Sequence, residues 1–166
     1  MSKDLFPQLK TMSMNEVEKN FKSIKDVIDV GNRPHYLYTA AVCGRLDIIK
    51  YFVEKLGVLP TTSDFKAACW ANHTEVAKYL TKYTYNLGKG LNYALMNKNS
   101  ELSTFLLEKI DMIDYKTYQG LFNYHSEFSS IINEKHLKYV IKLHGEDWGQ
   151  YLSGENISHD SVNSTE

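Results

Sequence analysis

One pattern of residues occurs three times in this chain. Each copy begins with a large apolar residue, followed after two residues by a pair of small or apolar residues; these copies start at Leu37, Phe65 and Leu91. A break and a second apolar segment follow in each copy. The starts lie 28 and then 26 residues apart, and no gap is needed inside a copy. Self-similarity over a few tens of residues indicates a stacked repeat fold, because a single unit cannot bury its own apolar face.

Each copy is expected to form two short helices. The first places apolar and small residues such as Leu37 and Ala40 on one face, so that neighbouring helices can approach closely. Gly44 and Asn72 stand in the break, and these residue types readily adopt the left-handed conformation that ends a helix. Lys98 takes this place in the third copy, flanked by Asn97 and Asn99, and we expect the turn to be kept with a different residue in the strained position. The second helices should bury Ile48, Ile49, Phe52, Val53, Val76, Ala77, Leu80, Leu102, Leu106 and Leu107.

The N-terminal segment predicts a helix that covers the first copy. Ser13 and Glu16 have the spacing of a capping box, in which each side chain bonds to the backbone of the other. A single apolar stripe at helical spacing follows, and it ends at the turn Gly31-Asn32-Arg33-Pro34. Its members are Met14, Val17, Phe21, Ile24 and Ile28. We therefore assign residues 1–34 to an N-terminal capping helix.

The C-terminal part continues the pattern weakly. A degenerate repeat from Leu121 to Leu143 is conceivable, but Tyr124 replaces the small residue of the other copies. We therefore expect 111–152 to be a degenerate repeat or a C-terminal cap. Residues 153–166 are rich in Ser, Asn and acidic residues, which predicts a polar tail.

The first copy resembles a repeat of a known family. Ala40-Ala41-x-x-Gly44-x-Leu46-Asp47-Ile48-Ile49-Lys50-Tyr51-Phe52 resembles the helix–turn–helix of an ankyrin repeat, and the resemblance extends over 37–110. His35-Tyr36-Leu37-Tyr38 stands where the family has Thr-Pro-Leu-His, and the steps are shorter than the usual 33 residues. The resemblance implies an all-α, ankyrin-like solenoid with N- and C-terminal capping helices, three repeats over 35–110 and trimmed or absent hairpins. It implies a binding role in general and names no partner.

Charge and composition exclude several classes of protein. The formal net charge is −1, and Lys and Glu alternate along most expected helices, so no basic face for nucleic acid is expected. The apolar runs are too short to span a membrane, and the N-terminus lacks the apolar core of a secretory signal. Cys43 and Cys69 are expected to be buried thiols in a reducing cytoplasm. Seventeen lysines against two arginines fit an AT-rich genome, as in many phages, large viruses and low-GC bacteria.

No arrangement of residues predicts catalysis. Gly88-Lys89-Gly90 is too short for a phosphate-binding loop, and Cys43 has no adjacent base or helix N-terminus to activate it. The histidines are scattered without the spacing of metal ligands, at His35, His73, His125, His136, His144 and His159. We expect a protein that is not an enzyme and needs no metal or cofactor.

The first helices carry aromatic and polar residues that their core pattern does not use. We expect these positions to face an inner groove that binds a protein partner: Tyr38, Val42, Cys43, Lys66, Trp70, Asn92, Met96 and Asn97. Tyr, Trp and Met are enriched at the centres of protein interfaces. In the alternative interpretation, Trp70 only packs against the neighbouring repeat. If the groove is not the site, the turns at 61–63 and 86–89 or the region of Trp148 and Tyr151 would be.

The function predicted from these features is protein–protein interaction without catalysis. A small cytoplasmic chain of this composition fits a phage, viral or bacterial factor that inhibits or redirects a host protein, inside the host cell if viral. Two alternatives belong to other classes. One is a structural subunit that forms homo-oligomers, and the other is a protein that binds a small molecule or nucleotide signal in the groove.

Overall fold

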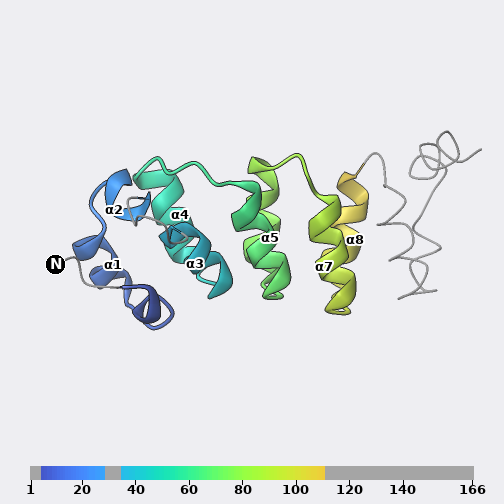
Figure 1. Cartoon of the computed structure of the whole chain (residues 1–166), viewed down its shortest axis with the longest axis horizontal. Helices are drawn as coiled ribbons and strands as arrows, with labels where there is room; N and C mark the ends of the chain where they lie inside the picture. Colours follow the sequence, from blue (N-terminus) through green and yellow to red (C-terminus); the bar gives the residue numbers. More distant parts are fainter. Residues whose placement is uncertain (1–4, 29–34, 111–166) are drawn as a thin grey trace, which may run out of the picture.

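The computed structural model describes residues 5–28 and 35–110, and the secondary structure in these ranges is entirely helical (Figure 1). No strand occurs in the described part, so the all-α class is confirmed there. The segments predicted as a C-terminal cap (111–152) and as a polar tail (153–166) lie outside the described residues.

Three helix pairs follow the three copies of the sequence pattern. The first pair is α3 (Tyr36–Val42) and α4 (Leu46–Lys50), which the π-helical η2 (Tyr51–Lys55) extends. The second pair is α5 (Thr62–Trp70) and α6 (Thr74–Leu80), followed by the 3₁₀ turn η3 (Thr81–Tyr83). The third is α7 (Gly88–Met96) and α8 (Ser100–Lys109).

The pairs are arranged in two rows. Helix α5 contacts both α3 and α7, which forms the first-helix row, and α6 contacts both α4 and α8, which forms the second-helix row. In Figure 1 the labelled helices α3, α5 and α7 stand one after another along the long axis of the molecule. Each pair therefore presents one helix to each row, and equivalent residues of successive pairs lie in neighbouring helices.

The same backbone turn ends the first helix of every pair. Gly44, Asn72 and Lys98 have φ angles of 71°, 62° and 55°, so all three residues are left-handed. The turn is kept in the third copy as expected, but Lys98 itself takes the strained position, and the expectation of a different residue there is wrong. The residue after each turn donates its backbone N–H to the helix end, at distances of 3.0, 2.9 and 2.9 Å. The acceptors are the carbonyls of Ala40, Ala68 and Ala94. This is the Schellman arrangement, which satisfies carbonyls that a helix end leaves unpaired.

The residue after each turn also holds the preceding unit through its side chain. Arg45 donates to the backbone carbonyls of the N-terminal segment at 2.8–3.2 Å. His73 Nε2 lies 2.9 Å from the carbonyl oxygen of Val42, and Asn99 Nδ2 donates to Asn72 Oδ1 at 2.7 Å. One sequence position thus links each unit to the one before it.

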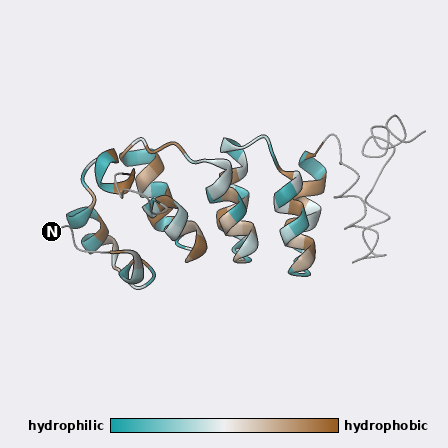
Figure 2. Cartoon of the chain, viewed as in Figure 1, coloured by the Kyte–Doolittle hydropathy of each residue, from teal (hydrophilic) through white to brown (hydrophobic). Residues whose placement is uncertain are grey.

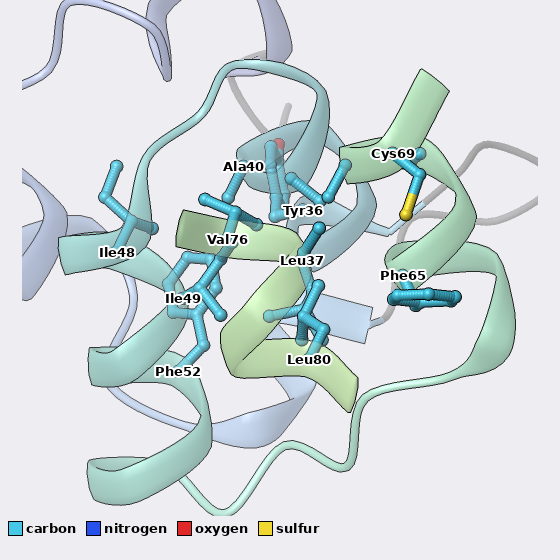
Figure 3. Close-up of a cluster of buried hydrophobic side chains, with 14 of the residues drawn as sticks. Tyr36, Leu37, Ala40, Ile48, Ile49, Phe52, Phe65, Cys69, Val76 and Leu80 are labelled. Carbon is cyan, nitrogen blue, oxygen red and sulfur yellow. The ribbon is translucent and has the colours of Figure 1, made fainter. Parts of the chain in front are cut away.

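The apolar positions of the pattern form a continuous core. Figure 3 shows Leu37 of the first-helix row next to Val76 and Leu80 of the second-helix row, and Phe65 at the edge of the cluster beside Cys69. All of the apolar residues expected to be buried by the second helices are buried except Val53, which is half-buried. Figure 2 shows hydrophobic and hydrophilic bands on the same helices, as expected when each helix has one face in the core.

The N-terminal segment differs from the expected single helix. The capping box is confirmed: the Glu16 N–H donates to Ser13 Oγ at 3.4 Å, and the Ser13 N–H donates to Glu16 Oε2 at 2.8 Å. However, the chain forms a 3₁₀ turn η1 (Phe6–Gln8) and two short helices, α1 (Met14–Asn20) and α2 (Ile24–Ile28). The prediction of one helix through this region is therefore wrong.

The break between α1 and α2 has a local and a tertiary cause. Phe21 leaves the helix in an extended conformation, and its buried ring lies 4.7 Å from the ring of Tyr36 and 5.1 Å from that of Phe52, between centroids. The backbone N–H groups of Lys22 and Ser23 then donate to Asp26 Oδ2, which starts a new helix. Because the new helix has another register, Ile24 and Ile28 are exposed and Val27 is buried.

Candidate binding surface

A pocket of about 340 Å³ opens on the first-helix row. Residues of three helices line it: Tyr38 of α3, Tyr93 of α7, and Ser63, Lys66, Ala67 and Trp70 of α5. Ala67 is only 4% exposed, whereas Trp70 is 61% exposed. The small alanine side chain therefore leaves a depression between side chains that rise around it.

The pocket brings together three of the eight residues that the sequence assigned to a partner site, namely Tyr38, Lys66 and Trp70. Ala67 and Tyr93 were not predicted from the sequence, and Ser63 was included only in the alternative site at 61–63. A signal for Tyr93 did exist, because this position is occupied by Thr39 and Ala67 in the other copies. An aromatic residue at a position that otherwise takes small side chains indicates that this side chain lies on the surface.

The other five predicted residues do not line the pocket. Met96 is 62% exposed and stands at the same position of its copy as Trp70. Asn97 is also exposed, and Val42, Cys43 and Asn92 are half-buried. Because Trp70 keeps most of its surface open, the structure does not fit the alternative in which this ring only packs against the neighbouring unit.

Asn97 has a structural role in addition to its exposed position. Its side-chain amide donates to the carbonyl oxygens of Cys69 at 2.9 Å and Trp70 at 3.2 Å. These carbonyls belong to the last turn of α5, where helix carbonyls lack partners within the helix. Asn97 therefore fixes the backbone that carries Trp70.

An ionisable pair, the half-buried His35 and the buried Asp64, joins the start of α3 to α5. His35 caps α3, since its Nδ1 accepts from the Tyr38 N–H at 3.3 Å, and its Nε2 lies 3.4 Å from Asp64 Oδ1. Asp64 is buried and accepts from the Thr61 N–H at 2.6 Å. Burial raises the pKa of the Asp64 carboxyl, while the Thr61 hydrogen bond and His35 act to lower it. The pair links the N-terminus of α3, three residues before Tyr38, to α5. It therefore fixes the wall of the pocket that Tyr38 forms.

Charge is divided between the two faces, contrary to the expected alternation of Lys and Glu. We define the first-helix face as residues 35–44, 61–71 and 87–98. Its only carboxylate is that of the buried Asp64, and its lysines are Lys66, Lys89 and Lys98. All of the other carboxylates between residues 35 and 110 belong to the second-helix row, at Asp47, Glu54, Glu75, Glu101 and Glu108.

The two faces also differ in how their cations are paired. On the second-helix row, Lys78 lies within ion-pair distance of Glu75 and Glu101, and Arg45 pairs with Asp47 at 2.6 Å. On the first-helix face, none of the three lysines forms an ion pair with another described residue. The face that holds the pocket is therefore positive and rich in aromatic residues.

Nothing in the described ranges 5–28 and 35–110 resembles a catalytic or metal centre. Both cysteines are free, and burial raises the pKa of the Cys69 thiol to about 12, which leaves it protonated at neutral pH. No three His, Cys, Asp or Glu side chains of this part are grouped so that they could hold a metal ion. None of its helices has both the length and the apolar character needed to cross a membrane.

Comparison of the chain with protein-family models, with curated proteins and with solved structures found no match.

Proposed function

We propose that this chain is a protein–protein interaction module without catalytic activity, built as an ankyrin-like helical repeat solenoid, and that its partner binds the first-helix face. The repeated helix pairs, the repeated Schellman turns and the two-row arrangement support the solenoid. They also place equivalent residues of successive units side by side, which is how repeat proteins make extended binding surfaces.

The observation that carries the proposed site is the exposure of large side chains at one repeated position. Trp70 and Met96 are 61% and 62% exposed and follow each other from α5 to α7, next to the pocket. Exposed aromatic and Met side chains are costly to leave in water and are enriched at the centres of interfaces. Their repetition on one face favours an interface over chance exposure.

The test needs the partner and a matched pair of variants. The immobilised protein would capture partners from a cell lysate, and mass spectrometry would identify them. Each candidate would then be purified, and its binding to this protein would be measured by calorimetric titration. Trp70→Ala with Met96→Ala should weaken binding about thirtyfold or more, or about 2 kcal/mol, with little change in melting temperature. Tyr85→Ala is the control, because Tyr85 is fully exposed but lies on the connector between the second and third pairs.

The control also distinguishes the two kinds of surface. Loss of binding in the double variant alone supports the first-helix face. Loss only in Tyr85→Ala, or unchanged binding in both, contradicts a site centred on Trp70 and Met96 and moves it to the turns at 61–63 and 86–89 or to the region of Trp148 and Tyr151. The bacterial, phage or viral origin, the cytoplasmic location and the interference with a host protein stay predictions from the sequence.

A second candidate function is the binding of a small molecule or nucleotide signal. The pocket volume of about 340 Å³ lies at the lower end of the range for ligand pockets, roughly 300–1,000 Å³. A thermal-shift screen with nucleotides and common metabolites would test this function. A rise in melting temperature that Ala67→Met abolishes would favour it, since the longer side chain fills the pocket.

Self-association is the third possibility predicted from the sequence. Leu59 and Tyr85 are exposed at equivalent positions of the two connectors and could serve it. Light scattering after size exclusion decides the matter, because a monomer at micromolar concentration would exclude a self-assembling subunit.

A further inference from the structure

The charge of the first-helix face indicates the chemistry of its partner. We infer that the partner presents an extended acidic peptide segment with one apolar anchor, whose carboxylates approach Lys66, Lys89 and Lys98 while the anchor enters the pocket. The inference rests on the proposed function, and it adds the class of partner to it. It is carried by two independent features of one face, the lysines that form no ion pair with another described residue and the aromatic pocket.

The lysines of this face can take partner carboxylates without losing an ion pair to any residue of 5–28 or 35–110. Lys78 on the second-helix row already has two carboxylate neighbours, so a new anion would have to displace them. Within the described part of the chain, Lys66, Lys89 and Lys98 have no such neighbour. The carboxylate nearest to Lys66 in the sequence, that of Asp64, is buried and accepts from Thr61, so it does not repel an incoming acid at the surface. The carboxylate nearest to Lys98, that of Glu101, forms an ion pair with Lys78.

The positions of the lysines fit a segment that crosses the row. Lys66 lines the pocket, and Lys89 and Lys98 stand at opposite ends of α7, so that they flank a chain crossing at the level of the pocket. Packed helix axes are roughly 8–10 Å apart, and an extended chain rises about 3.3 Å per residue. About three peptide residues therefore span from one helix of the row to the next, which predicts acidic residues about three positions from the anchor.

The pocket accounts for the anchor. Trp70 and Tyr93 offer apolar ring surface, and the small side chain of Ala67 leaves depth between them. An apolar side chain that enters this pocket is removed from water against the rings, while the chain on either side stays at the surface near the lysines. Aromatic residues are enriched at interface centres, whereas charged residues such as these lysines belong to the rim.

Nucleic acid fits this face less well. Proteins that bind duplex DNA through its backbone typically make roughly six to ten phosphate contacts, whereas this face offers three lysines and no arginine. The formal net charge of the chain is −1, so the rest of the molecule adds no attraction for a polyanion. A short acidic segment needs only a few cations and uses the pocket as well.

A random dodecapeptide library displayed on phage provides the test. The full chain is the bait, and the inference expects enriched peptides that contain several Asp or Glu residues and one Leu, Met or aromatic anchor. Synthetic dye-labelled copies of the enriched peptides would then be titrated by fluorescence anisotropy, together with copies in which Asp and Glu are replaced by Asn and Gln. The acidic copy should bind at least about tenfold more tightly, since each exposed ion pair contributes a few-fold.

Two triple variants with equal loss of charge locate the effect. Lys66→Gln, Lys89→Gln and Lys98→Gln together should reduce affinity for the acidic peptide at least about tenfold and remove the difference between the acidic and amide copies. Lys55→Gln, Lys82→Gln and Lys109→Gln on the second-helix row should change the affinity less than about twofold. Circular dichroism checks that both variants are folded.

Each other outcome overturns the inference in a distinguishable way. Enrichment of neutral apolar peptides leaves a protein-binding face but contradicts the acidic partner. Equal losses in both triple variants would mean that overall charge, rather than this face, attracts the peptide. Binding of a labelled oligothymidylate that needs the three lysines would assign the face to nucleic acid. Failure to enrich any peptide also refutes the inference, whereas the pull-down with Trp70→Ala and Met96→Ala decides the proposed function separately.

Discussion

The contact between His73 and Gly44 predicts a large cost for adding a single methyl group. A Cβ placed on Gly44 would lie 2.5 Å from Nδ1 and 2.9 Å from Cγ of the His73 ring, which is closer than real Cβ contacts. The ring is not free to move, because its Nε2 is held 2.9 Å from the carbonyl oxygen of Val42. Gly44→Ala must therefore displace a side chain that links the second unit to the first.

Gly57 provides a matched control. Its φ of 73° is nearly the same as the 71° of Gly44, but a Cβ on Gly57 meets no atom within 4 Å. Gly57→Ala should cost only the left-handed backbone strain of a residue with a Cβ, about 1–2 kcal/mol. Gly44→Ala should cost the same strain plus the loss of the His73 hydrogen bond, about 0.5–1.5 kcal/mol, and some repacking. We expect Gly44→Ala to be less stable than Gly57→Ala by about 1–2 kcal/mol.

Urea denaturation followed by circular dichroism measures both free energies of unfolding. The entropy that alanine removes from the unfolded chain is the same at both sites and cancels in the comparison. His73→Ala should reduce the penalty of Gly44→Ala, so that the double variant is more stable than the sum of the single changes predicts, by about 1 kcal/mol. Equal costs at Gly44 and Gly57, or strict additivity with His73→Ala, would refute the contact.

Three further predictions follow from buried groups. Gly90→Ala should lower the free energy of unfolding by about 1–3 kcal/mol, because the new Cβ would lie 2.3 Å from Cζ of the buried Phe65. Alanine favours helix over glycine, so a raised melting temperature would contradict this clash. Ala68→Leu should cost about 1–3 kcal/mol in urea denaturation, because Ala68 is fully buried in the helix that contacts both neighbours of its row. Burial raises the pKa of the Asp64 carboxyl from its usual 3.8. The protonated carboxyl therefore contributes fully to the stability of the fold below pH 3.8, and this contribution is lost as the pH rises through the raised pKa. Asp64→Asn should therefore gain stability relative to the original chain as the pH rises from below 3.8 through the raised pKa of Asp64, and a difference that stays constant over this titration would disprove the shift.

The sequence by itself determined the features that depend on neighbouring residues. The left-handed turns at Gly44, Asn72 and Lys98 follow from a pattern that ends one apolar helix face and begins another within a few residues. The capping box at Ser13 is equally local, since both of its partners lie within one turn. Such features are visible in a sequence because one short segment contains every atom that makes them.

Tertiary structure decided the features that depend on which side chain fills a given space. Phe21 matches a helical stripe in sequence, but its ring is buried between Tyr36 and Phe52, and the helix breaks there. Tyr93 became part of the pocket because Ala67 of the neighbouring helix is small, and periodicity within one copy does not contain that relation. A repeat pattern states which face of each helix is apolar; the contacts between helices determine which residues stay open on the other face, because their side chains must fit together in three dimensions.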